Sequence, residues 1–342
     1  LSFLFSILLL GLYWPCLVLS IIYSIYFFFN TPSIRNYTAN RLNKLYTFIF
    51  IIGVFFGSIA IRVFVLEFYS IPTGSMENSL FIGDKIMVSK LNYGPKLPRT
   101  PFDIPWLNLF FYINKDARAA KDSTWYKYNR LSGFSDIKRN DVVVFSHPNN
   151  TKQVYVKRCI GLSGESISIK GSSVYINNKI LEEVKSIEHD YVKIALNGLT
   201  DSIVLKDTDI GIVNNTKIPW SLNNWGPVTV PKKGETIELN ENNFFLYSNV
   251  LKQYENIEIY KRNGILYSYG KVIRKHTFKQ DYYLVLGDNR NQSYDSRYWG
   301  LLEGWRVEGR AMFTYFSYNK GSYRPFPWIR EVRWGRVLDG IS

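Results

Sequence analysis

Two long apolar runs open the chain, and both are long enough to cross a membrane. Residues 1–29 contain no charged side chain, and residues 45–66 are interrupted only by Arg62. A helix needs about 20 apolar residues to span the hydrocarbon core of a bilayer. We therefore predict two transmembrane helices, with Arg62 near enough to one end for its guanidinium to reach the interface.

The segment between these runs, residues 30–44, predicts their orientation. It carries Arg35, Arg41 and Lys44 and no acidic residue. Short loops rich in Lys and Arg stay on the cytoplasmic side. A cleaved signal peptide would begin with a basic region and end at a small-residue site, and neither is present. In a bacterium, the chain is then expected to be a multi-pass protein of the inner membrane, with everything after Glu67 on the periplasmic or extracytoplasmic side.

Beyond residue 67, alternating and β-branched runs predict strands separated by turns. Asn140 precedes one of these runs, and Asn tolerates a left-handed turn. The runs that predict strands lie at 80–90, 141–147, 153–160, 173–176, 244–247, 282–286 and 309–317.

Two long segments interrupt this pattern. Residues 94–135 begin rich in Pro and contain an aromatic cluster at 104–112. Trp and Tyr favour the membrane interface, so the cluster is expected either to enter that zone or to pack in the core. Residues 170–280 contain short β-like runs between Asn and Gly turns and are predicted to form a β-rich subdomain without a catalytic motif. The tail, residues 321–342, is basic and aromatic.

Charge and cysteine content narrow the possible partners and cofactors. The net charge of the 342 residues is +14, but the Lys and Arg residues are scattered, which favours anionic lipid over nucleic acid as a partner. A coding bias toward lysine and asparagine explains the charge equally well. The 2 Cys and 3 His lack the spacing of a disulfide framework or a metal site. We expect no metal and no cofactor.

One short stretch after the second apolar run has the features of a nucleophile turn. Pro72 fixes φ and Gly74 permits a tight bend, so Ser75 is presented on a constrained turn. Thr73 offers a hydroxyl donor beside the Ser75 amide. Alone, such a stretch is more often an ordinary turn that leaves a membrane helix.

A lysine in the predicted strand 153–160 is the candidate base. Period-two alternation puts Tyr155, Lys157 and Cys159 on one face. Lowering the pKa of a lysine from about 10.4 to about 8 by burial costs roughly 3 kcal/mol, and such costs are concentrated at functional sites. The alternative is a lysine whose stem lies on an apolar face while its ammonium reaches water.

Residues 287–300 form a polar loop in which two Asp and two Arg alternate with Ser. The loop is either a long Asx-rich turn or a hydrogen-bonded, ion-paired support for a site.

Taken in order, these segments resemble bacterial type I signal peptidases, membrane-bound serine proteases that use a lysine as general base. The match covers about half the chain. The resemblance implies that Ser75 is the nucleophile, Lys157 the neutral amine that takes its proton, and Ser293 the hydroxyl that orients the lysine. It places the Thr73 hydroxyl in an oxyanion hole with the Ser75 amide.

The resemblance also assigns supporting and substrate-binding residues. The supporting residues are Arg158, Asp288, Arg290, Asp295 and Arg297. The residues expected to line pockets for small side chains or to contact substrate are Ile71, Pro72, Met76, Leu80, Tyr155 and Val156. The substrate peptide is expected to add as an extended strand. The sequence departs from the usual motifs at Asn78, Ser79, Asn140 and Asn291.

Two other functions fit parts of the sequence. Residues 317–320 have the Ser-x-x-Lys spacing of penicillin-binding proteins, but that chemistry needs a helix and the segment is predicted to end a strand. A catalytically inactive, membrane-tethered β-rich scaffold or adaptor would explain the anchors, but it leaves the combination of Ser75, Lys157 and Ser293 to coincidence.

The sequence therefore predicts two N-terminal transmembrane α-helices followed by a mainly antiparallel β catalytic domain with a β-rich insertion. The predicted parts are helix 1–29, cytoplasmic loop 30–44, helix 45–66, catalytic core 67–169 and 281–320 with insertion 94–135, subdomain 170–280 and tail 321–342. The expected activity is removal of signal peptides from preproteins by cleavage after a small residue. The expected partners are preprotein signal peptides and anionic membrane lipid.

Overall fold

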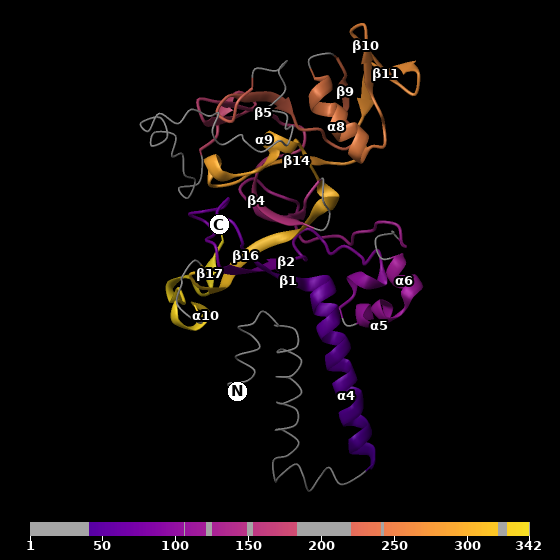
Figure 1. The fold of residues 1–342 in the computed structure, drawn as a ribbon, viewed down its shortest axis with the longest axis vertical. Coiled ribbons are helices and arrows are strands. Elements are labelled where there is room, and N and C mark those ends of the chain that lie inside the picture. Colours follow the sequence, from indigo (N-terminus) through magenta and orange to yellow (C-terminus); the bar gives the residue numbers. More distant parts are fainter. Residues whose placement is uncertain are drawn as a thin grey trace. The chain divides into compact units, whose positions relative to one another are not determined.

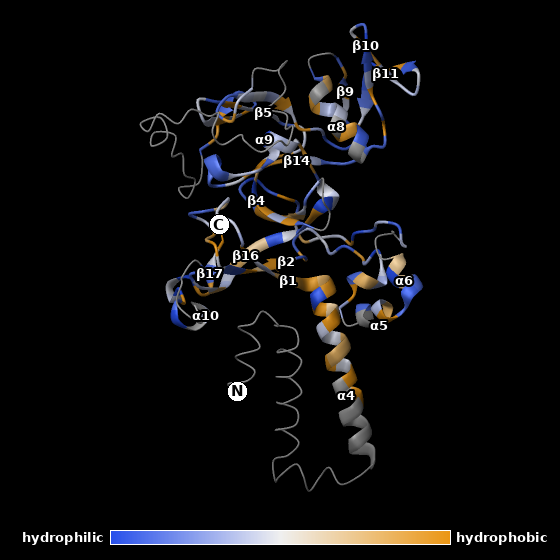
Figure 2. Ribbon diagram, in the orientation of Figure 1, coloured by the Kyte–Doolittle hydropathy of each residue, from blue (hydrophilic) through white to orange (hydrophobic). Residues whose placement is uncertain are grey.

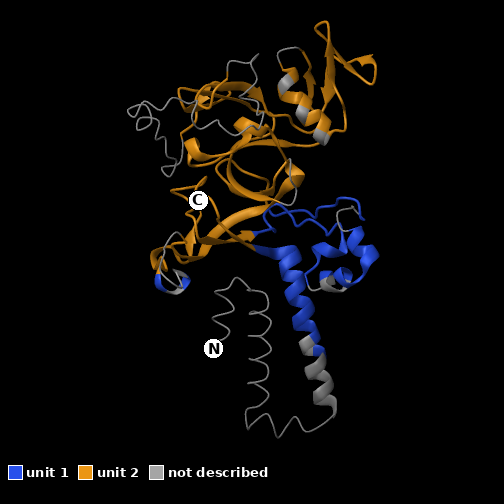
Figure 3. Ribbon diagram, viewed as in Figure 1, with its two compact units in different colours: residues 1–67, 89–134, 328–330 blue, residues 68–88, 135–327, 331–342 orange. Residues whose placement is uncertain are grey.

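The structure, a computed structural model, describes residues 41–342 except 106, 121–124, 149–152, 183–219, 241–242, 321–326 and 342. The predicted helix 1–29 lies outside the described residues. The chain divides into two compact units (Figure 3), one made of residues 1–67, 89–134 and 328–330, the other of residues 68–88, 135–327 and 331–342. Each unit is considered by itself.

The first unit contains the second apolar run, which is helical. Helix α4 spans Arg41–Ala60 and continues as a π-helical turn, Ile61–Val65; its described part is rich in hydrophobic residues (Figure 2). Arg62 Nε lies 3.1 Å from one oxygen of Glu67, and Lys90 Nζ lies 2.8 Å from the other. Among the described residues, no helix is both long and apolar enough to cross a membrane. The membrane span at 45–66 stays a prediction.

The insertion at 94–135 folds into short helices. They are a 3-10 turn Pro101–Asp103, α5 Leu107–Ile113 and α6 Lys115–Ala119. The Phe102 ring makes edge contacts with Phe111, Tyr112 and Trp125, with ring centroids 5.1 to 6.3 Å apart. Phe111 and Tyr112 of the aromatic cluster therefore pack against Phe102, which precedes the cluster in the same insertion. An approach of this segment to the membrane stays a prediction.

The second unit is built on a mainly antiparallel sheet that curls into a half-barrel (Figure 1), with strand order β1-β2-β16-β3-β4-β14-β15 and β17 paired to β16. The strands are β1 Leu66–Ser70, β2 Asp84–Ser89, β3 Val142–Ser146, β4 Val154–Gly161, β14 Tyr282–Leu286, β15 Leu302–Glu303, β16 Val307–Ser317 and β17 Asp339–Gly340. These strands confirm the predictions at 80–90, 141–147, 153–160, 282–286 and 309–317, although β16 begins two residues earlier and β4 ends one residue later than predicted.

The short helices of this unit lie between or after the strands. They are the 3-10 turns Arg290–Gln292, Gly304–Arg306 and Trp334–Arg336 and helix α9 Ser296–Trp299. Helix α10 spans Pro327–Arg330, of which residues 328–330 are assigned to the first unit.

A buried apolar cluster packs the residues around the Ser75 turn against the sheet. Every residue of β3 is buried, as expected for a β-branched run. The cluster comprises Ile71, Met76, Leu80, Ile86, Val88, Val142, Val144 and Ala311. Asn140, just before β3, has φ 68°, which confirms the left-handed turn expected there. The turn that carries Ser75 is thus anchored by side chains in the core.

The insertion at 170–280 is rich in strands, as predicted. One sheet has the order β7-β6-β5-β8, with β6 Ser173–Ile176, β7 Lys179–Ile180 and β8 Trp225–Thr229. Its remaining strand, β5 Ser166–Lys170, begins before the predicted boundary at 170. A pair joins β9 Thr236–Glu238 to β13 Lys275–Thr277, and a third sheet contains β10 Tyr260–Arg262, β11 Ile265–Ser268 and β12 Lys271–Val272. Strand β6 has the bounds that the sequence predicted.

The prediction of a strand at 244–247 is wrong, because these residues begin helix α8, Phe244–Tyr254. Leu246, Tyr247, Val250 and Leu251 are all buried. Their spacing of three and four residues is that of one helix face. The four residues 244–247 alone fit either a strand or a helix, and only the longer pattern distinguishes the two.

Candidate active site

Ser75 lies on a turn that is held from both sides. Before it, the Ile71 amide donates to the Asp84 carbonyl at 2.8 Å, and the Gly83 amide donates to the Ile71 carbonyl at 3.0 Å. After it, the Leu80 amide donates to the Met76 carbonyl at 2.7 Å. The Ile71 and Met76 side chains are buried. Backbone bonds and core packing together fix the direction in which Ser75 points.

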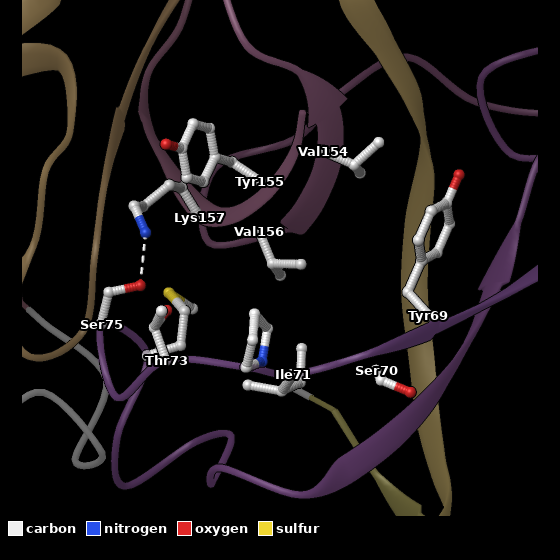
Figure 4. A pocket seen from close by; sticks show the side chains of 11 residues that line it. Tyr69, Ser70, Ile71, Thr73, Ser75, Val154, Tyr155, Val156 and Lys157 are labelled. Atoms are coloured by element: carbon white, nitrogen blue, oxygen red, sulfur yellow. Dashed lines mark hydrogen bonds between the residues drawn. The ribbon is translucent and has the colours of Figure 1, made fainter. Parts of the chain in front are cut away.

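Lys157, on β4, contacts Ser75. Its Nζ lies 2.5 Å from Ser75 Oγ (Figure 4) although the two residues are 82 positions apart in sequence. The lysine is 2% exposed. Burial lowers the pKa of Lys157 to about 8, although the carboxylates of Asp295 and Asp288 act to raise it. The side chain is therefore desolvated, and the alternative of an ammonium that reaches water does not apply.

A cavity opens beside this pair. Its lining residues are Tyr69, Ser70, Ile71, Pro72, Thr73, Ser75, Met76, Val154, Tyr155, Val156 and Lys157. Figure 4 shows Lys157 pointing toward Ser75 at one end, with Val154 and Tyr69 toward the other. Of the substrate-binding residues predicted from the sequence, Leu80 is not in this lining; it is fully buried in the core. The predicted oxyanion residue Thr73 lines the cavity and is exposed.

The edge of β4 beside the cavity is open. Strand β4 pairs with β3 from Val154 to Arg158 but with β14 only from Arg158 to Gly161. Among the described strands, none pairs with residues 154–157 on their second side. Unpaired strand edges are templates for an added extended peptide. The open edge lies along the wall that carries Lys157.

A buried ion pair connects β4 to the loop 287–300. Arg158 Nε and Nη2 donate to the two oxygens of Asp288 at 2.8 and 2.7 Å, and both side chains are fully buried. The Ser79 hydroxyl donates to Asp288 at 2.5 Å. Arg158 Nη1 also donates to the Asn140 carbonyl at 2.8 Å. Bidentate pairs of this kind fix geometry as well as charge. Arg158, next to Lys157, and Ser79, in the turn after Ser75, thus both bind the Asp288 carboxylate.

A second buried pair holds the loop itself. Arg297 Nε and Nη2 donate to the two Asp295 oxygens, each at 2.9 Å. The Gly287 amide donates to Asp295 at 3.1 Å, and Arg297 Nη2 donates to the Arg290 carbonyl at 2.6 Å. Burial acts to raise the pKa of Asp295, but the charge and hydrogen bonds of Arg297, together with the hydrogen bond from the Gly287 amide, lower that pKa overall. All four charged residues predicted in the loop therefore lie in a buried polar network.

Ser293 and Ser75 both lie close to Gly287. A Cβ added to Gly287 would collide with the Ser293 hydroxyl and the Ser75 carbonyl. The Ser293 side chain is buried, and no hydrogen bond joins it to Lys157 in the part of the chain that the structure describes. Sequence reasoning passed over Gly287 as a functional residue. The available signal was a glycine at the end of a predicted buried strand, where close backbone approach is common.

Two of the departures from the usual motifs sit in left-handed turns. Asn78 has φ 77° and Asn140 has φ 68°. A proline at position 78 is incompatible with this φ, because its ring fixes φ near −65°. Ser79 retains a hydroxyl, and that hydroxyl bonds Asp288. The turn after Ser75 thus has its own local conformation while keeping its bond to the supporting carboxylate.

Comparison of the chain with known proteins finds relatives in one protein family. Residues 42–316 match the family "Signal peptidase, peptidase S26". The chain is 30% identical over 281 residues to the signal peptidase I of Buchnera aphidicola subsp. Baizongia pistaciae, covering 81% of this chain and 77% of that protein. It is 27% identical to the signal peptidase I of Buchnera aphidicola subsp. Schizaphis graminum, covering 91% and 90%. It is 28% identical to the signal peptidase I of Helicobacter pylori strain J99, covering 74% and 76%.

The family match includes the Ser75 turn, β4 with Lys157 and the loop 287–300. This chain belongs to the signal peptidase I family, peptidase S26, a family of serine endopeptidases.

Proposed function

We propose that the chain is a membrane-bound endopeptidase that removes N-terminal signal peptides from exported preproteins by cleavage after a small residue. Its proposed location is the bacterial inner membrane, with the catalytic domain on the periplasmic side. The observation that carries the proposal is the 2.5 Å contact between Lys157 Nζ and Ser75 Oγ, made by a lysine that is 2% exposed. Activation of a serine needs a base within hydrogen-bond reach.

In the first step, the neutral Lys157 amine takes the proton of Ser75 as Oγ attacks the scissile carbonyl carbon. The new C–O bond forms, and the carbonyl π electrons move to the oxygen. With a pKa of about 8 for Lys157, about a tenth of the molecules hold the amine neutral at pH 7. This fraction is large enough for a general base.

The developing oxyanion is proposed to accept hydrogen bonds from the Thr73 hydroxyl and the Ser75 amide. Thr73 lines the same cavity as Ser75. A donor of this kind accelerates acyl transfer by about 10²- to 10³-fold. In the next step, the Lys157 ammonium gives its proton to the leaving nitrogen as the C–N bond breaks, and the mature protein departs with a new N-terminus.

The signal peptide is then bound to Ser75 as an ester. Lys157 takes a proton from water as the water oxygen bonds to the ester carbon. The bond between that carbon and Ser75 Oγ then breaks, Oγ takes the proton back from Lys157, and the signal peptide leaves with a new C-terminal carboxyl group. Ser293 is proposed to orient Lys157 with substrate bound, since catalytic hydrogen bonds often tighten only in the complex.

Substrate selection is proposed to follow from the cavity walls and the open strand edge. An extended peptide would pair with residues 154–157 and place its reacting carbonyl beside Ser75. The side chains of Ile71, Met76, Tyr155 and Val156 line the cavity and favour small residues at the −1 and −3 positions. Pro72 completes the wall, and Leu80 supports it from the core. The partners are thus preprotein signal peptides and, through the anchors, anionic membrane lipid.

An inactive scaffold would leave the buried lysine without a role. Holding a lysine with a pKa of about 8 costs roughly 3 kcal/mol of stability below that pH. Among the described residues, the Lys157 nitrogen contacts the Ser75 hydroxyl and lies 5.8 Å from the centroid of the Tyr155 ring. Contacts of this kind are each worth about 1 kcal/mol and offset only part of the cost. The cost is explained if the neutral amine is needed for chemistry.

The test is cleavage of a purified preprotein by the intact chain and its variants in detergent micelles. Ser75→Ala and Lys157→Ala are each expected to abolish cleavage. Ser132→Ala and Lys233→Ala, which change exposed side chains, serve as matched controls and are expected to cleave normally. Cleavage by the Ser75→Ala variant would show that another residue is the nucleophile and would overturn the proposal.

A further inference from the structure

The C-terminal segment, residues 331–341, is bound along β16. Strand β17 pairs with Phe313 and Thr314, and the Leu338 amide donates to the Thr314 carbonyl at 2.7 Å. The Ile341 amide donates to the Met312 carbonyl at 2.9 Å. The Arg333 amide donates to the Ser317 carbonyl, also at 2.9 Å. These backbone bonds hold the segment in one register and fix where its arginines point.

Both arginines of this segment, Arg333 and Arg336, lie near a buried carboxylate, Asp84, at the start of β2. Asp84 is fully buried and accepts a hydrogen bond from the Ser317 hydroxyl at 2.6 Å. Arg336 Nη2 donates to it at 2.8 Å, and Arg333 Nη1 lies 3.6 Å away. A buried carboxylate is costly unless it is paired and hydrogen-bonded. The C-terminal segment supplies the positive charge that Asp84 requires.

Arg336 also binds the turn that follows the nucleophile. Its Nη2 donates to the Ser79 carbonyl at 2.9 Å. Its guanidinium carbon lies 4.5 Å from the centroid of the Phe81 ring, within the range of a cation–π contact. Arg333 Nη2 donates to the Ile82 carbonyl at 3.2 Å. The two arginines of the C-terminal segment therefore bind residues 79–84.

Ser79 connects Arg336 to the candidate active site. Its carbonyl accepts from Arg336, while its hydroxyl binds Asp288, the partner of Arg158 next to Lys157. Its amide donates to the Met76 carbonyl at 3.1 Å, directly after Ser75. One residue thus connects the C-terminal arginine to the turn of the nucleophile and to the support of the base.

We propose that Arg336 is a positioning residue for the Ser75–Lys157 pair, acting through Ser79 and Asp84. The inference rests on the proposed function of that pair. Arg336 touches neither the cavity nor the reacting atoms, so its loss displaces Ser75 relative to Lys157 without changing the residues that contact the peptide. Small displacements of a catalytic group lower the rate steeply.

The test compares Arg336→Ala with Arg330→Ala, an exposed arginine of the same tail, in preprotein cleavage by the full chain. Arg336→Ala is expected to lower kcat by about 10- to 100-fold with KM unchanged. Arg336→Lys is expected to recover only part of this loss, because one ammonium does not reproduce a planar guanidinium that bonds Asp84 and Ser79 together. Arg330→Ala is expected to behave as the parent chain.

Two readouts separate positioning from a general loss of structure. Added millimolar guanidinium ion is expected to restore part of the kcat of Arg336→Ala and to leave the parent unaffected. Hydrogen exchange of peptides covering 75–84 is expected to accelerate in Arg336→Ala, while exchange in β3 and β14 stays unchanged. An unchanged kcat in Arg336→Ala would overturn the inference. So would a loss of kcat that guanidinium does not restore and that is accompanied by faster exchange throughout the sheet. Failure of the parent chain itself to cleave would instead count against the proposed function.

Discussion

Replacing Lys157 with Met is predicted to stabilise the fold while abolishing activity. The lysine is 2% exposed, and burial lowers its pKa from 10.5 to about 8. Below pH 8 it is protonated in both the folded and unfolded states, and the folded state carries the full desolvation penalty. A difference of 2.5 pKa units at 1.36 kcal/mol each is roughly 3 kcal/mol. Met has a similar length and no charge to bury.

The stabilisation by Lys157→Met is expected to decrease as the pH rises. As the pH rises from 8 to 10.5, the folded chain loses the proton before the unfolded chain does, so the penalty shrinks and is gone above 10.5. The stabilisation by Lys157→Met is therefore expected to be largest at pH 7 and to fall toward zero near pH 10.5. Loss of the bond to Ser75 Oγ reduces the gain by about 1 kcal/mol.

The assay is thermal unfolding of the parent and the Lys157→Met variant in the same detergent at pH 7 and pH 10. Lys233→Met, at an exposed position, controls for the loss of a surface charge. A Lys157→Met variant that is less stable than the parent at pH 7, or whose difference does not change with pH, would refute the reasoning that the lysine is held desolvated.

Two further predictions concern the support of the site. Gly287→Ala is expected to destabilise the fold by about 1–3 kcal/mol and to abolish cleavage, because the added Cβ collides with the Ser75 carbonyl; melting temperature and preprotein cleavage measure both effects. Normal cleavage by this variant would show that the strand end tolerates a side chain. Asp288→Ala is expected to destabilise by about 3–5 kcal/mol, because it leaves the fully buried guanidinium of Arg158 without its counter-charge. Denaturant titration at neutral pH measures this, and a loss below 1 kcal/mol would contradict it.

Much of the sheet could be predicted because its strands carry a local signal. The run 142–146 is β-branched and fully buried, and such runs have few alternatives to a central strand. Helix α8 was missed because the aromatic residues at its start fit a strand over a window of four. Its pattern becomes helical only with Val250 and Leu251, one turn further on.

Local context marks Ser75 and Lys157 only as candidates, and their roles are implied by the family resemblance. Ser75 follows a Pro-Thr-Gly turn, and Lys157 shares a strand face with Tyr155. Their contact across 82 positions is a consequence of the curled sheet, and no local pattern encodes it. It was anticipated only through the family resemblance.

The sequence indicates no role in the site for Asp84 or Arg336, for a related reason. An Asp after a Gly is typical of a turn, and an Arg near a chain end is usually a solvated charge. Their ion pair joins positions 252 apart and depends on the C-terminal segment following β16. Long-range pairing of this kind is set by tertiary structure, which local propensity does not contain.

The pH dependence of kcat/KM for preprotein cleavage by the intact chain tests the central claim most directly. If neutral Lys157 takes the proton of Ser75, kcat/KM is expected to rise about tenfold per pH unit below pH 8 and to level off above a pKa of about 8. A profile that is flat from pH 6 to 9, or that levels off near the pKa of about 6.5 of an ordinary histidine, would contradict the assignment of Lys157 as the base.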